Sequence, residues 1–483
     1  MSDVIVVGAG PTGLMLAGEL ALAGVDVEVL ERRTTAELVG TRARGFHART
    51  IEIFDQRGIA ERFLEAGQTV QGLRFGDTGL DLASFPSRHA YTLGLGQSSI
   101  EQILLGWVEE LGVPIRRGVD VVGFEQDDVG VDVHVDGRAG RRTAYLVGAD
   151  GGRSVVRKAA GIDFVGAEPS RSYLIGEVAV TEEVQPGLRL DDVGIHGLNV
   201  MPAGTVGFVV TEQELVTATE PTLEALREAL VAVFGTDFGA HDPTWLSRFT
   251  DATRQAAVYR QGRVLLAGDA AHTHPPTGGQ GIGLGVQDAV NLGWKLAQVV
   301  CGVSPDPLLD SYQAERRAPT DRVLKNVMTQ ALLQRGDART EAVRATFSEV
   351  LQFDEPRNHL AGLLSGLDVQ YDLGEGHPLL GRRMPDLDLD TEDGPRRVFE
   401  LLHTARPVLV NLGAPDSIDI SPWSERVMRV EASYVGGWAL PVVGSVSAPA
   451  AVLIRPDGHV AWVGDGSQDG LREALTTWFG QPG

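Results

Sequence analysis

Val4-Ile5-Val6-Val7-Gly8-Ala9-Gly10-Pro11-Thr12-Gly13 joins a run of β-branched residues to a turn rich in glycine. A helix-like run follows over residues 14–20, and a second apolar run over residues 25–30 ends at Glu31. This order predicts a strand, a tight turn, a helix and a second strand, which together form a dinucleotide-binding unit.

The residue types at the key positions of that unit each have a physical reason. Gly8 permits the tight turn, Gly10 lets the backbone approach a pyrophosphate, and Gly13 lets the helix pack closely on the strand. Glu31 can accept a hydrogen bond from a ribose hydroxyl. The alternative is a glycine-rich turn without a ligand, but the strand, the helix and the acid in their places favour the dinucleotide site.

The composition limits the class of protein. The chain has 483 residues, with 42 basic and 65 acidic side chains and a net charge of −23, which disfavours nucleic acid and anionic membranes as partners. No apolar run reaches the roughly 18 residues of a membrane span, and no basic leader opens the chain, so a cytoplasmic enzyme is expected. The single cysteine, Cys301, excludes an internal disulfide and is expected in the core, because it ends an apolar helix-like run.

The rest of the chain alternates between helix-like and strand-like patterns. Residues 99–105 favour a helix and residues 129–135 a half-buried strand. Residues 166–254 are dominated by strand-like pieces and are expected to form an inserted second domain. A long helical stretch is predicted from residue 286 through 300 and on from residue 308 to about 366, and an apolar hairpin closes the tail around Arg455-Pro456-Asp457-Gly458.

A second informative segment is Gly148-Ala149-Asp150-Gly151-Gly152-Arg153-Ser154, which follows an apolar strand and precedes Arg157. Asp150 can order this loop, and Arg153 or Arg157 can pair with a phosphate or with a loop carboxylate. An equally good interpretation from these residues alone is a helix cap with surface arginines.

The third segment is Val264-Leu265-Leu266-Ala267-Gly268-Asp269, where an apolar strand runs into Gly-Asp. Asp269 is predicted at the carboxyl end of a strand, where α/β sheets bind ligands, and it can accept a hydrogen bond from a ribityl hydroxyl. The loop from Pro275 to Gly281 then leads into a helix, and it can present backbone N–H groups to a flat, electron-rich ring. His272 and His274 lack a third ligand nearby, so no metal site is predicted.

Taken in this order, the three motifs resemble the group A flavoprotein monooxygenases, the family of para-hydroxybenzoate hydroxylase. The likeness extends to enzymes that hydroxylate aromatic polyketides and to rifampicin monooxygenases, through residues 248–256, 312–317, 359–363 and 378–386. It thus covers almost the whole chain. An NAD-dependent dehydrogenase is a weaker alternative, because it gives no reason for the Asp150 and Asp269 segments.

The resemblance implies which residues serve the cofactor. FAD is expected to contact Gly8, Gly10, Gly13, Glu31, Arg32, Arg42, Arg44, Gln97, Asp150, Asp269, Gly281, Ile282 and Gly283. Arg44 is favoured over Arg42 as the arginine of the flavin loop, although both stay candidates. The catalytic part is expected to be the flavin-face loop, through backbone groups of Pro276, Gly279 and Gly281. Gly283 departs from the family, which has an asparagine there; a glycine removes an amide and loosens the helix start.

The resemblance also implies an α/β fold with three parts. A Rossmann-like FAD-binding domain is expected over residues 1–72, 97–165 and 255–330. A substrate-binding domain with an inserted mixed β-sheet is expected over residues 73–96 and 166–254. A helical connection and linker over 331–394 then leads to a thioredoxin-like domain over 395–483, which lacks cysteine and is expected to serve as an interface or scaffold.

The implied reaction uses FAD, with NAD(P)H and O2 as co-substrates. A C4a-hydroperoxyflavin is expected to hydroxylate a large polycyclic aromatic polyketide or antibiotic, in a monomer or homodimer with no metal. Candidate substrate contacts are Phe75, Leu93, Leu95, Met201 and Phe208. Two alternatives stay open: an antibiotic-inactivating monooxygenase of the rifampicin type, and a flavin-containing antibiotic-binding protein with weak activity.

Overall fold

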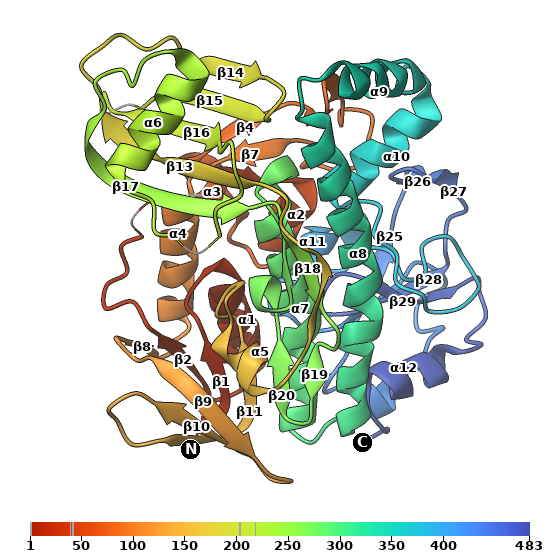
Figure 1. Ribbon diagram of the computed structural model, residues 1–483. Coiled ribbons are helices and arrows are strands. Elements are labelled where there is room, and N and C mark those ends of the chain that lie inside the picture. Colours follow the sequence, from red (N-terminus) through yellow and green to blue (C-terminus); the bar gives the residue numbers. More distant parts are fainter. Residues whose placement is uncertain (1, 39, 41–42, 202–203, 218) are drawn as a thin grey trace.

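The computed structural model describes residues 2–38, 40, 43–201, 204–217 and 219–483. Its centre is an eight-stranded sheet in which β8, β2, β1, β11 and β20 are parallel neighbours (Figure 1). The strands of this sheet are β1 (Ser2–Val7), β2 (Val27–Glu31), β8 (Ile115–Arg117), β9 (Val121–Gln126), β10 (Val131–Val135), β11 (Arg141–Gly148), β19 (Arg260–Gln261) and β20 (Val264–Leu266). The predicted strand–turn–helix–strand unit is therefore present.

Three helices pack on this sheet, and they cross one another closely at glycine positions. They are α1 (Pro11–Leu22), α4 (Gln97–Glu110) and α7 (Gly281–Val300). A β-carbon at Gly18 of α1 would lie 2.2 Å from the Trp107 ring of α4, and one at Gly293 of α7 would lie 2.5 Å from the β-carbon of Glu19. Neither position leaves room for a side chain. These two glycines therefore fix the packing of α1 between α4 and α7.

A second sheet lies at the upper left of Figure 1. Its strand order is β14 (Gly187–Leu190), β15 (Ile195–Val200), β16 (Val206–Thr211), β13 (Ser172–Ala179) and β17 (His241–Thr250), and α6 (Leu223–Phe234) covers one face. Every pair in it is antiparallel, so the expectation of a mixed inserted sheet is wrong. Hairpin-like connections between consecutive strands make that pattern possible.

Three small sheets and the remaining helices join these parts. The small sheets are β3 (Gly45–Phe46) with β7 (Thr92–Gly94) and β4 (Gln68–Val70), β5 (Leu73–Phe75) with β6 (Thr78–Leu80), and β12 (Phe164–Ala167) with β18 (Thr253–Ala256) and β21 (His272–Thr273). The helices are α2 (Ala48–Asp55), α3 (Ala60–Ala66), α5 (Val155–Ala159), α8 (Asp310–Leu333), α9 (Ala338–Val350) and α10 (Asp354–Ser365), with short η1 (Gly268–Ala270), η2 (Thr277–Gly279) and η3 (Asp306–Leu309). Within residues 73–96, β5 pairs with β6, and β7 pairs with β3 and β4.

The C-terminal residues form a third sheet, on the right of Figure 1. The elements of this part are β22 (Asp388–Thr391), β23 (Gly394–Arg397), α11 (Val398–Leu401), β24 (Val408–Asn411), η4 (Ser421–Trp423), β25 (Met428–Ser433), β28 (Ala451–Ile454), β29 (Val460–Gly464) and α12 (Leu471–Phe479), and a separate hairpin of β26 (Trp438–Leu440) and β27 (Gly444–Val446). The order is β23-β22-β25-β24-β28-β29, with β24 and β25 parallel and β28 and β29 forming the predicted hairpin.

Both faces of the C-terminal sheet are buried. Val408 and Val410 point into one hydrophobic cluster, whereas Leu409 belongs to another that also contains Trp294 of α7 and Leu308 of η3. The sheet thus packs directly on the helices that follow the central sheet. Cys301 was expected in the core, but it is exposed. It is the C-cap residue of α7 and lies just past the buried part of that helix.

Candidate functional site

The predicted motifs meet at one edge of the central sheet. Four neighbouring parallel strands, β20, β11, β1 and β2, end at this edge with the Gly268 turn, the Asp150 loop, the Gly8 turn and Glu31 respectively. Backbone hydrogen bonds stitch the ends together: Ala149 N–H donates to the Val7 carbonyl at 2.8 Å, and Ala267 N–H to the Gly148 carbonyl at 3.0 Å. Segments up to 260 residues apart in sequence are therefore held side by side.

The glycine turn is shaped by two close approaches and one open position. A β-carbon at Gly8 would lie 2.4 Å from the Ala149 carbonyl oxygen, and one at Gly13 would lie 1.9 Å from the Gly8 carbonyl oxygen. At Gly10 nothing lies within 4 Å of the same position. Gly10 is also the N-cap of α1 and has no side-chain cap, so the first turn of α1 presents its N–H groups toward free space.

Glu31 anchors a polar network beside this turn. Its carboxylate accepts hydrogen bonds from the N–H groups of Ala9 and Arg33, both at 2.7 Å, and it is 8% exposed. Since a carboxylate has about four acceptor sites, it can still accept from a ribose hydroxyl. Arg32, the other expected cofactor contact in this segment, is exposed.

Sequence reasoning missed the partner of Glu31. The Arg33 guanidinium donates to Glu101 at 2.8 Å and to the Ala9 carbonyl at 3.2 Å, while Gln97 donates to the other Glu101 oxygen at 2.9 Å. Burial alone would lower the pKa of Arg33, but Glu101 and Glu31 raise it above its ordinary value. Arg33 thus stays charged, and it ties the expected cofactor residues Glu31 and Gln97 into one network.

Asp150 acts on its own loop. Its carboxylate accepts hydrogen bonds from the Ser154 hydroxyl at 2.5 Å and from the Val155 N–H at 2.7 Å, so it caps α5. Arg157 is buried and donates to the carbonyls of Gly152 and Ala270, both at 2.9 Å, which joins the second motif to the third. The helix-cap interpretation of this segment therefore holds for Asp150, and Arg157 has its donors occupied by backbone.

The third motif forms the short helix η1. Gly268 has a φ of +61°, and a β-carbon there would lie 2.5 Å from Thr12 Oγ1, so the turn packs on the start of α1. Asp269 is exposed, while its neighbours Gly268 and Ala270 are buried. Its carboxylate is accordingly available to a ligand at the strand edge.

A buried carboxylate on α7 holds that turn. Asp288 accepts hydrogen bonds from Gly268 N–H at 3.0 Å, His272 Nε2 at 2.6 Å and Arg316 Nε at 2.8 Å, and its side chain has no exposed surface. Although burial favours the neutral acid, His272 and Arg316 hold the pKa of Asp288 below its ordinary value. An ionised Asp288 therefore fixes the backbone next to Asp269.

The loop between Pro275 and Gly281 is a tight turn. Gly278 and Gly279 have φ of +78° and +65°, and both Pro276 and Gly279 are exposed. Because a carbonyl only accepts, His47 Nε2–H donates to the Gly278 carbonyl, at 2.8 Å. His47 Nδ1 then accepts from the Thr92 hydroxyl at 3.2 Å. Burial lowers the pKa of His47, which favours the neutral imidazole. In this tautomer the neutral ring holds the loop in place through the Gly278 carbonyl.

The helix α7 starts at Gly281 with no side-chain cap and no acidic residue in its first turn. Its N–H groups and the positive end of its dipole are therefore free for an electron-rich ring edge. Ile282 packs on the main core. A β-carbon at Gly283 would lie 2.9 Å from Thr50 Oγ1, and Gly283 lines a cavity of about 30 Å³ with His47, Gln287 and Asp368. The helix start is therefore packed against α2, and the glycine leaves a space of a few waters behind it.

Arg44 lies in a segment fixed by the chain between β7 and the start of α4. The Arg44 carbonyl accepts from Leu95 N–H at 3.1 Å, and the Ala43 carbonyl from Gln97 N–H at 3.2 Å. Arg44 is exposed, and its Nη2 lies 3.6 Å from where a β-carbon of Gly207 would be. The other candidate, Arg42, lies outside the described residues.

The expected substrate contacts do not form one pocket. Phe75 belongs to a buried cluster with α9 and α10, Leu93 and Leu95 to the main core, and Phe208 to the cluster under α6. Because these side chains fill three separate cores, the expectation that they jointly line a pocket is wrong. Met201 alone is partly exposed, and its sulfur lies 3.3 Å from where a β-carbon of Gly207 would be.

For Phe208, the expectation assigned the side chain to the wrong face of its strand. Side chains alternate along a strand, so Phe208 points to α6 and its neighbour Val209 points the other way. The pairing register puts Tyr173, Ile175, Val209, Trp245 and Phe249 on that other face, which we call the inner face, together with the polar Glu177, Thr211 and Ser247. Tyr173 and Phe249 stack there with ring centroids 4.8 Å apart.

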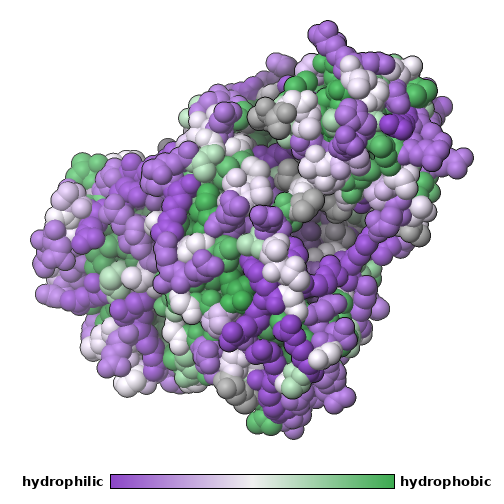
Figure 2. All heavy atoms as spheres, turned by 90° about the vertical axis from the view of Figure 1, so that its left-hand side faces the viewer, coloured by the Kyte–Doolittle hydropathy of each residue, from purple (hydrophilic) through white to green (hydrophobic). Residues whose placement is uncertain are grey.

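The inner face is turned toward the cofactor loops. A β-carbon at Gly40 would lie 2.4 Å from the Trp245 indole, so this ring rests on the chain that leads from Glu31 to Arg44. Figure 2 looks onto that side of the molecule and shows hydrophobic patches within a largely hydrophilic surface. A flat apolar ligand could rest on stacked aromatic rings here with its edge toward Arg44.

The edge of the sheet fits an FAD molecule. The open position at Gly10, the uncapped starts of α1 and α7, and the exposed Asp269 each offer what one part of that cofactor needs: room for a diphosphate, N–H donors and a hydroxyl acceptor. His272 and His274 are used otherwise, because they bond to Asp288 and to the Pro275 carbonyl. Among the described residues, no helix combines the length and apolar character needed to cross a membrane.

Known proteins match the chain over its whole length. Residues 1–327 match the family described as FAD binding domain, and residues 377–482 match the one described as aromatic-ring hydroxylase, C-terminal. The 12-dehydrotetracycline 5-monooxygenase/anhydrotetracycline 6-monooxygenase of Streptomyces rimosus is 45% identical over 505 residues, and a rifampicin monooxygenase of Streptomyces venezuelae is 45% identical over 492, each with 99% of both chains covered. The solved structure of an anhydrotetracycline hydroxylase from Streptomyces rimosus aligns with a TM-score of 0.91 at 43% identity, over 100% of both chains.

The two glycines of the turn should separate folding from cofactor binding. Gly10→Ala should leave the free energy of unfolding of the apoprotein within about 1 kcal/mol of wild type, because its φ of −80° suits any residue and the space around it is open. FAD affinity should fall at least about tenfold, since the methyl group occupies the diphosphate position. Gly13→Ala, by contrast, should destabilise the apoprotein itself. Equal FAD affinity in wild type and Gly10→Ala would contradict this assignment.

His47 should make the fold sensitive to acid. Because its folded pKa lies below its unfolded value near 6.5, the unfolded chain binds more protons below that pH, and stability falls as the pH drops. His47→Asn keeps a donor for the Gly278 carbonyl but does not titrate. Denaturant unfolding between pH 7 and 5 should therefore show a shallower loss for the variant, by up to about 1 kcal/mol per pH unit. Parallel curves would show that His47 is not held neutral.

Proposed function

The chain belongs to the family of FAD-dependent aromatic-ring hydroxylases, and we propose that it is a monooxygenase acting on a large polycyclic aromatic polyketide or antibiotic, with NAD(P)H and O2 as co-substrates. The observation that carries the proposal is the meeting of four cofactor-type loops at the ends of β20, β11, β1 and β2. The names of the tetracycline and rifampicin relatives support the substrate class.

Bound FAD would supply electron transfer from the nicotinamide and activation of O2. The residues of this chain hold it: Gly10 and the start of α1 at the diphosphate, Glu31 at the ribose, and Asp269 at the ribityl chain. The start of α7 would stabilise negative charge at the ring edge through Gly281, whose N–H group is uncapped.

The flavin-face loop would orient the reacting groups and exclude water. Its turn, closed by the Gly279 N–H bond to the Pro276 carbonyl at 3.1 Å, exposes backbone on one side while His47 holds the other. A rigid loop of this kind fixes the distance between ring and substrate, which is where an oriented site gains its rate. We keep Pro276, Gly279 and Gly281 as the proposed catalytic backbone.

We propose that the substrate lies on the inner face, between Phe249 and the flavin-face loop. Stacked aromatic rings offer a polycyclic ligand apolar area at low entropic cost. Arg44, at the rim of that face, would meet a polar or anionic group of the substrate or cofactor. Met201 is the one residue of the original substrate set that fits this location.

The domain division belongs to the same proposal. The central sheet is assigned to FAD binding and the antiparallel sheet of residues 166–254 to substrate binding. The C-terminal part, over residues 395–483, is proposed as thioredoxin-like, because its strand order β22-β25-β24-β28-β29 has a central parallel pair and a terminal antiparallel hairpin. We also propose a cytoplasmic monomer or homodimer with no nucleic-acid partner, in keeping with the net charge of −23.

Product analysis tests the proposal. The FAD-loaded enzyme is incubated in air with NADH or NADPH and, separately, with naphthacene quinones, angucyclines and rifamycins. We expect one of these to stimulate NAD(P)H consumption and to gain one oxygen atom, which carries label when the gas is isotopically labelled O2. A labelled rifamycin alone would point to antibiotic inactivation. Tight binding of an aromatic ligand without NAD(P)H consumption would instead favour the antibiotic-binding alternative and contradict a hydroxylase.

Two phenylalanines on opposite faces of the same sheet test the substrate location. Phe249→Leu should raise the KM for the aromatic substrate several-fold, because it removes a ring from the inner face. Its matched control, Phe208→Leu, changes the same residue type on the α6 face. The control should lower stability by about 1–3 kcal/mol and leave KM unchanged. Steady-state kinetics and unfolding curves are measured for both variants. A raised KM in Phe208→Leu with an unchanged KM in Phe249→Leu would reject the inner face as the substrate location.

A further inference from the structure

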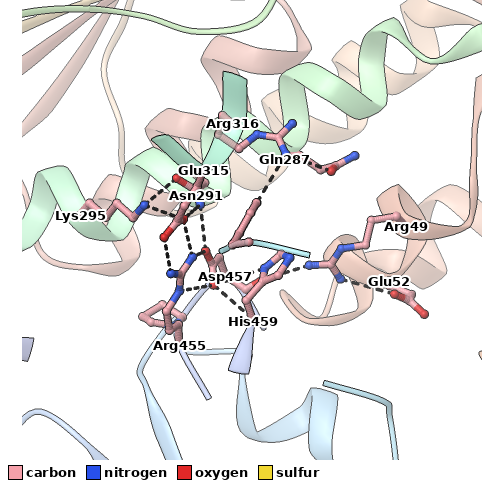
Figure 3. Close-up of polar contacts among 12 residues, drawn as sticks. Arg49, Glu52, Gln287, Asn291, Lys295, Glu315, Arg316, Arg455, Asp457 and His459 are labelled. Atoms are coloured by element: carbon pink, nitrogen blue, oxygen red, sulfur yellow. Dashed lines mark hydrogen bonds and ion pairs between the residues drawn. The ribbon is translucent and has the colours of Figure 1, made fainter. Parts of the chain in front are cut away.

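A buried cluster of charges joins the C-terminal sheet to the helices of the first domain (Figure 3). The Arg455 guanidinium forms a bidentate pair with Glu315 of α8, at 2.6 and 2.8 Å, and a second pair with Asp457 at 2.5 Å. Lys295 of α7 donates to the same Glu315 at 2.8 Å, and Asn291 donates to Glu315 at 2.6 Å. We call these five residues the Arg455 cluster.

The Arg455 cluster is enclosed and electrically balanced. Arg455 and Lys295 are 0% exposed, and the Arg455 guanidinium lies 4.7 Å from the centre of the Trp478 ring. Although burial would raise it, the pKa of Glu315 is held at about 2 by Arg455 and Lys295, so two cations face two carboxylates. A buried group of this kind costs desolvation, and replacing it with apolar residues is often neutral or better for stability. The cluster is therefore better judged by the elements that it fixes than by its net effect on stability.

One contact path leads from the Arg455 cluster to the Asp269 turn. Arg316, next to Glu315 on α8, pairs with Asp288 at 2.8 Å, and Asp288 accepts from Gly268 N–H at 3.0 Å. In Figure 3 Arg316 and Glu315 leave the same helix toward different partners. A shift of Glu315 therefore moves the residue that orients Asp288, and with it the backbone beside Asp269.

A second path leads to the flavin-face loop. The Asp457 carbonyl accepts from Arg49 Nη2 at 3.0 Å, and Arg49 lies in the first turn of α2. His47, the N-cap of α2, donates to the Gly278 carbonyl. The tight turn that carries Arg455 and Asp457 thus fixes the start of α2 and, through it, the loop.

A third path reaches the glycine turn. Arg57 donates to the Pro456 carbonyl at 2.7 Å and forms a buried pair with Glu19 of α1 at 2.5 Å. Since α1 starts at the glycine turn, the same C-terminal turn also sets the helix that would receive the diphosphate. All three paths start within residues 455–457.

We infer that Arg455 is a positioning residue for the cofactor: the Arg455 cluster holds α1, α2, α7 and α8 in the arrangement that FAD binding requires. The C-terminal part of the chain then contributes to FAD affinity through these helices. This inference rests on the proposed function in taking FAD as the ligand.

Arg455→Lys is the sharpest test, because it keeps the charge and loses the planar fork that serves two carboxylates at once. Arg248→Lys is a matched control, since Arg248 forms a bidentate pair with Glu212 at 2.8 Å in the antiparallel sheet, with both side chains about 10% exposed. Apoprotein is prepared from wild type and both variants, folding is checked by circular dichroism and cooperative unfolding, and FAD dissociation constants are measured by fluorescence titration. Wild type is titrated first, because its affinity tests the proposed function alone.

We expect Arg455→Lys to fold and to bind FAD at least tenfold more weakly, while Arg248→Lys changes the FAD dissociation constant by less than twofold. A folded Arg455→Lys apoprotein with wild-type FAD affinity would overturn the inference and leave the proposed function intact. Equal weakening in both variants would overturn it too, because it would mark a general loss of stability.

Hydrogen–deuterium exchange decides the case if Arg455→Lys does not fold. Because coupling between two sites is reciprocal, FAD should slow amide exchange over residues 455–459 of the wild-type protein. Residues 438–446 of the same C-terminal part, in β26 and β27, serve as the internal control and should exchange equally with and without FAD. No change at 455–459 on saturation with FAD would refute the coupling.

Discussion

Asp288 sits in the middle of α7 with no exposed surface and receives hydrogen bonds from Gly268, His272 and Arg316. Removing one partner of such a buried pair costs about 3–5 kcal/mol, because the other charge is left without compensation. The strand end that carries Asp269, the histidine after it and the helix α8 are therefore fixed by one carboxylate. The other loops of the edge are placed relative to that strand end.

The predictions from sequence succeeded where short-range geometry sets the structure. Gly8 and Gly13 each sit where a β-carbon would strike backbone, so the spacing of the turn encodes its shape. The apolar runs before Gly148 and Gly268 encode neighbouring parallel strands, whose carboxyl ends must share an edge.

The predictions failed where the structure depends on a one-residue difference in strand register or on a partner far away in the sequence. Phe208 and Val209 look alike in sequence, but only the pairing with β13 tells which of them faces α6. Arg455 and Glu315 are 140 residues apart, and the sequence around Arg455 predicts only a turn, so their pairing leaves no local signal. Arg33 was missed for a similar reason, because its partner Glu101 lies 68 residues further along the chain, in α4.

Together these contacts describe a cofactor edge built from the central sheet and braced from the C-terminal turn. The claim common to all of it is that this edge binds FAD, one molecule to each chain. Titration of the apoprotein with FAD, followed by visible absorption and fluorescence, tests it directly. We expect saturation at one equivalent and a yellow protein that keeps its flavin through gel filtration. Folded protein that stays colourless and leaves the fluorescence of added FAD unchanged would contradict it.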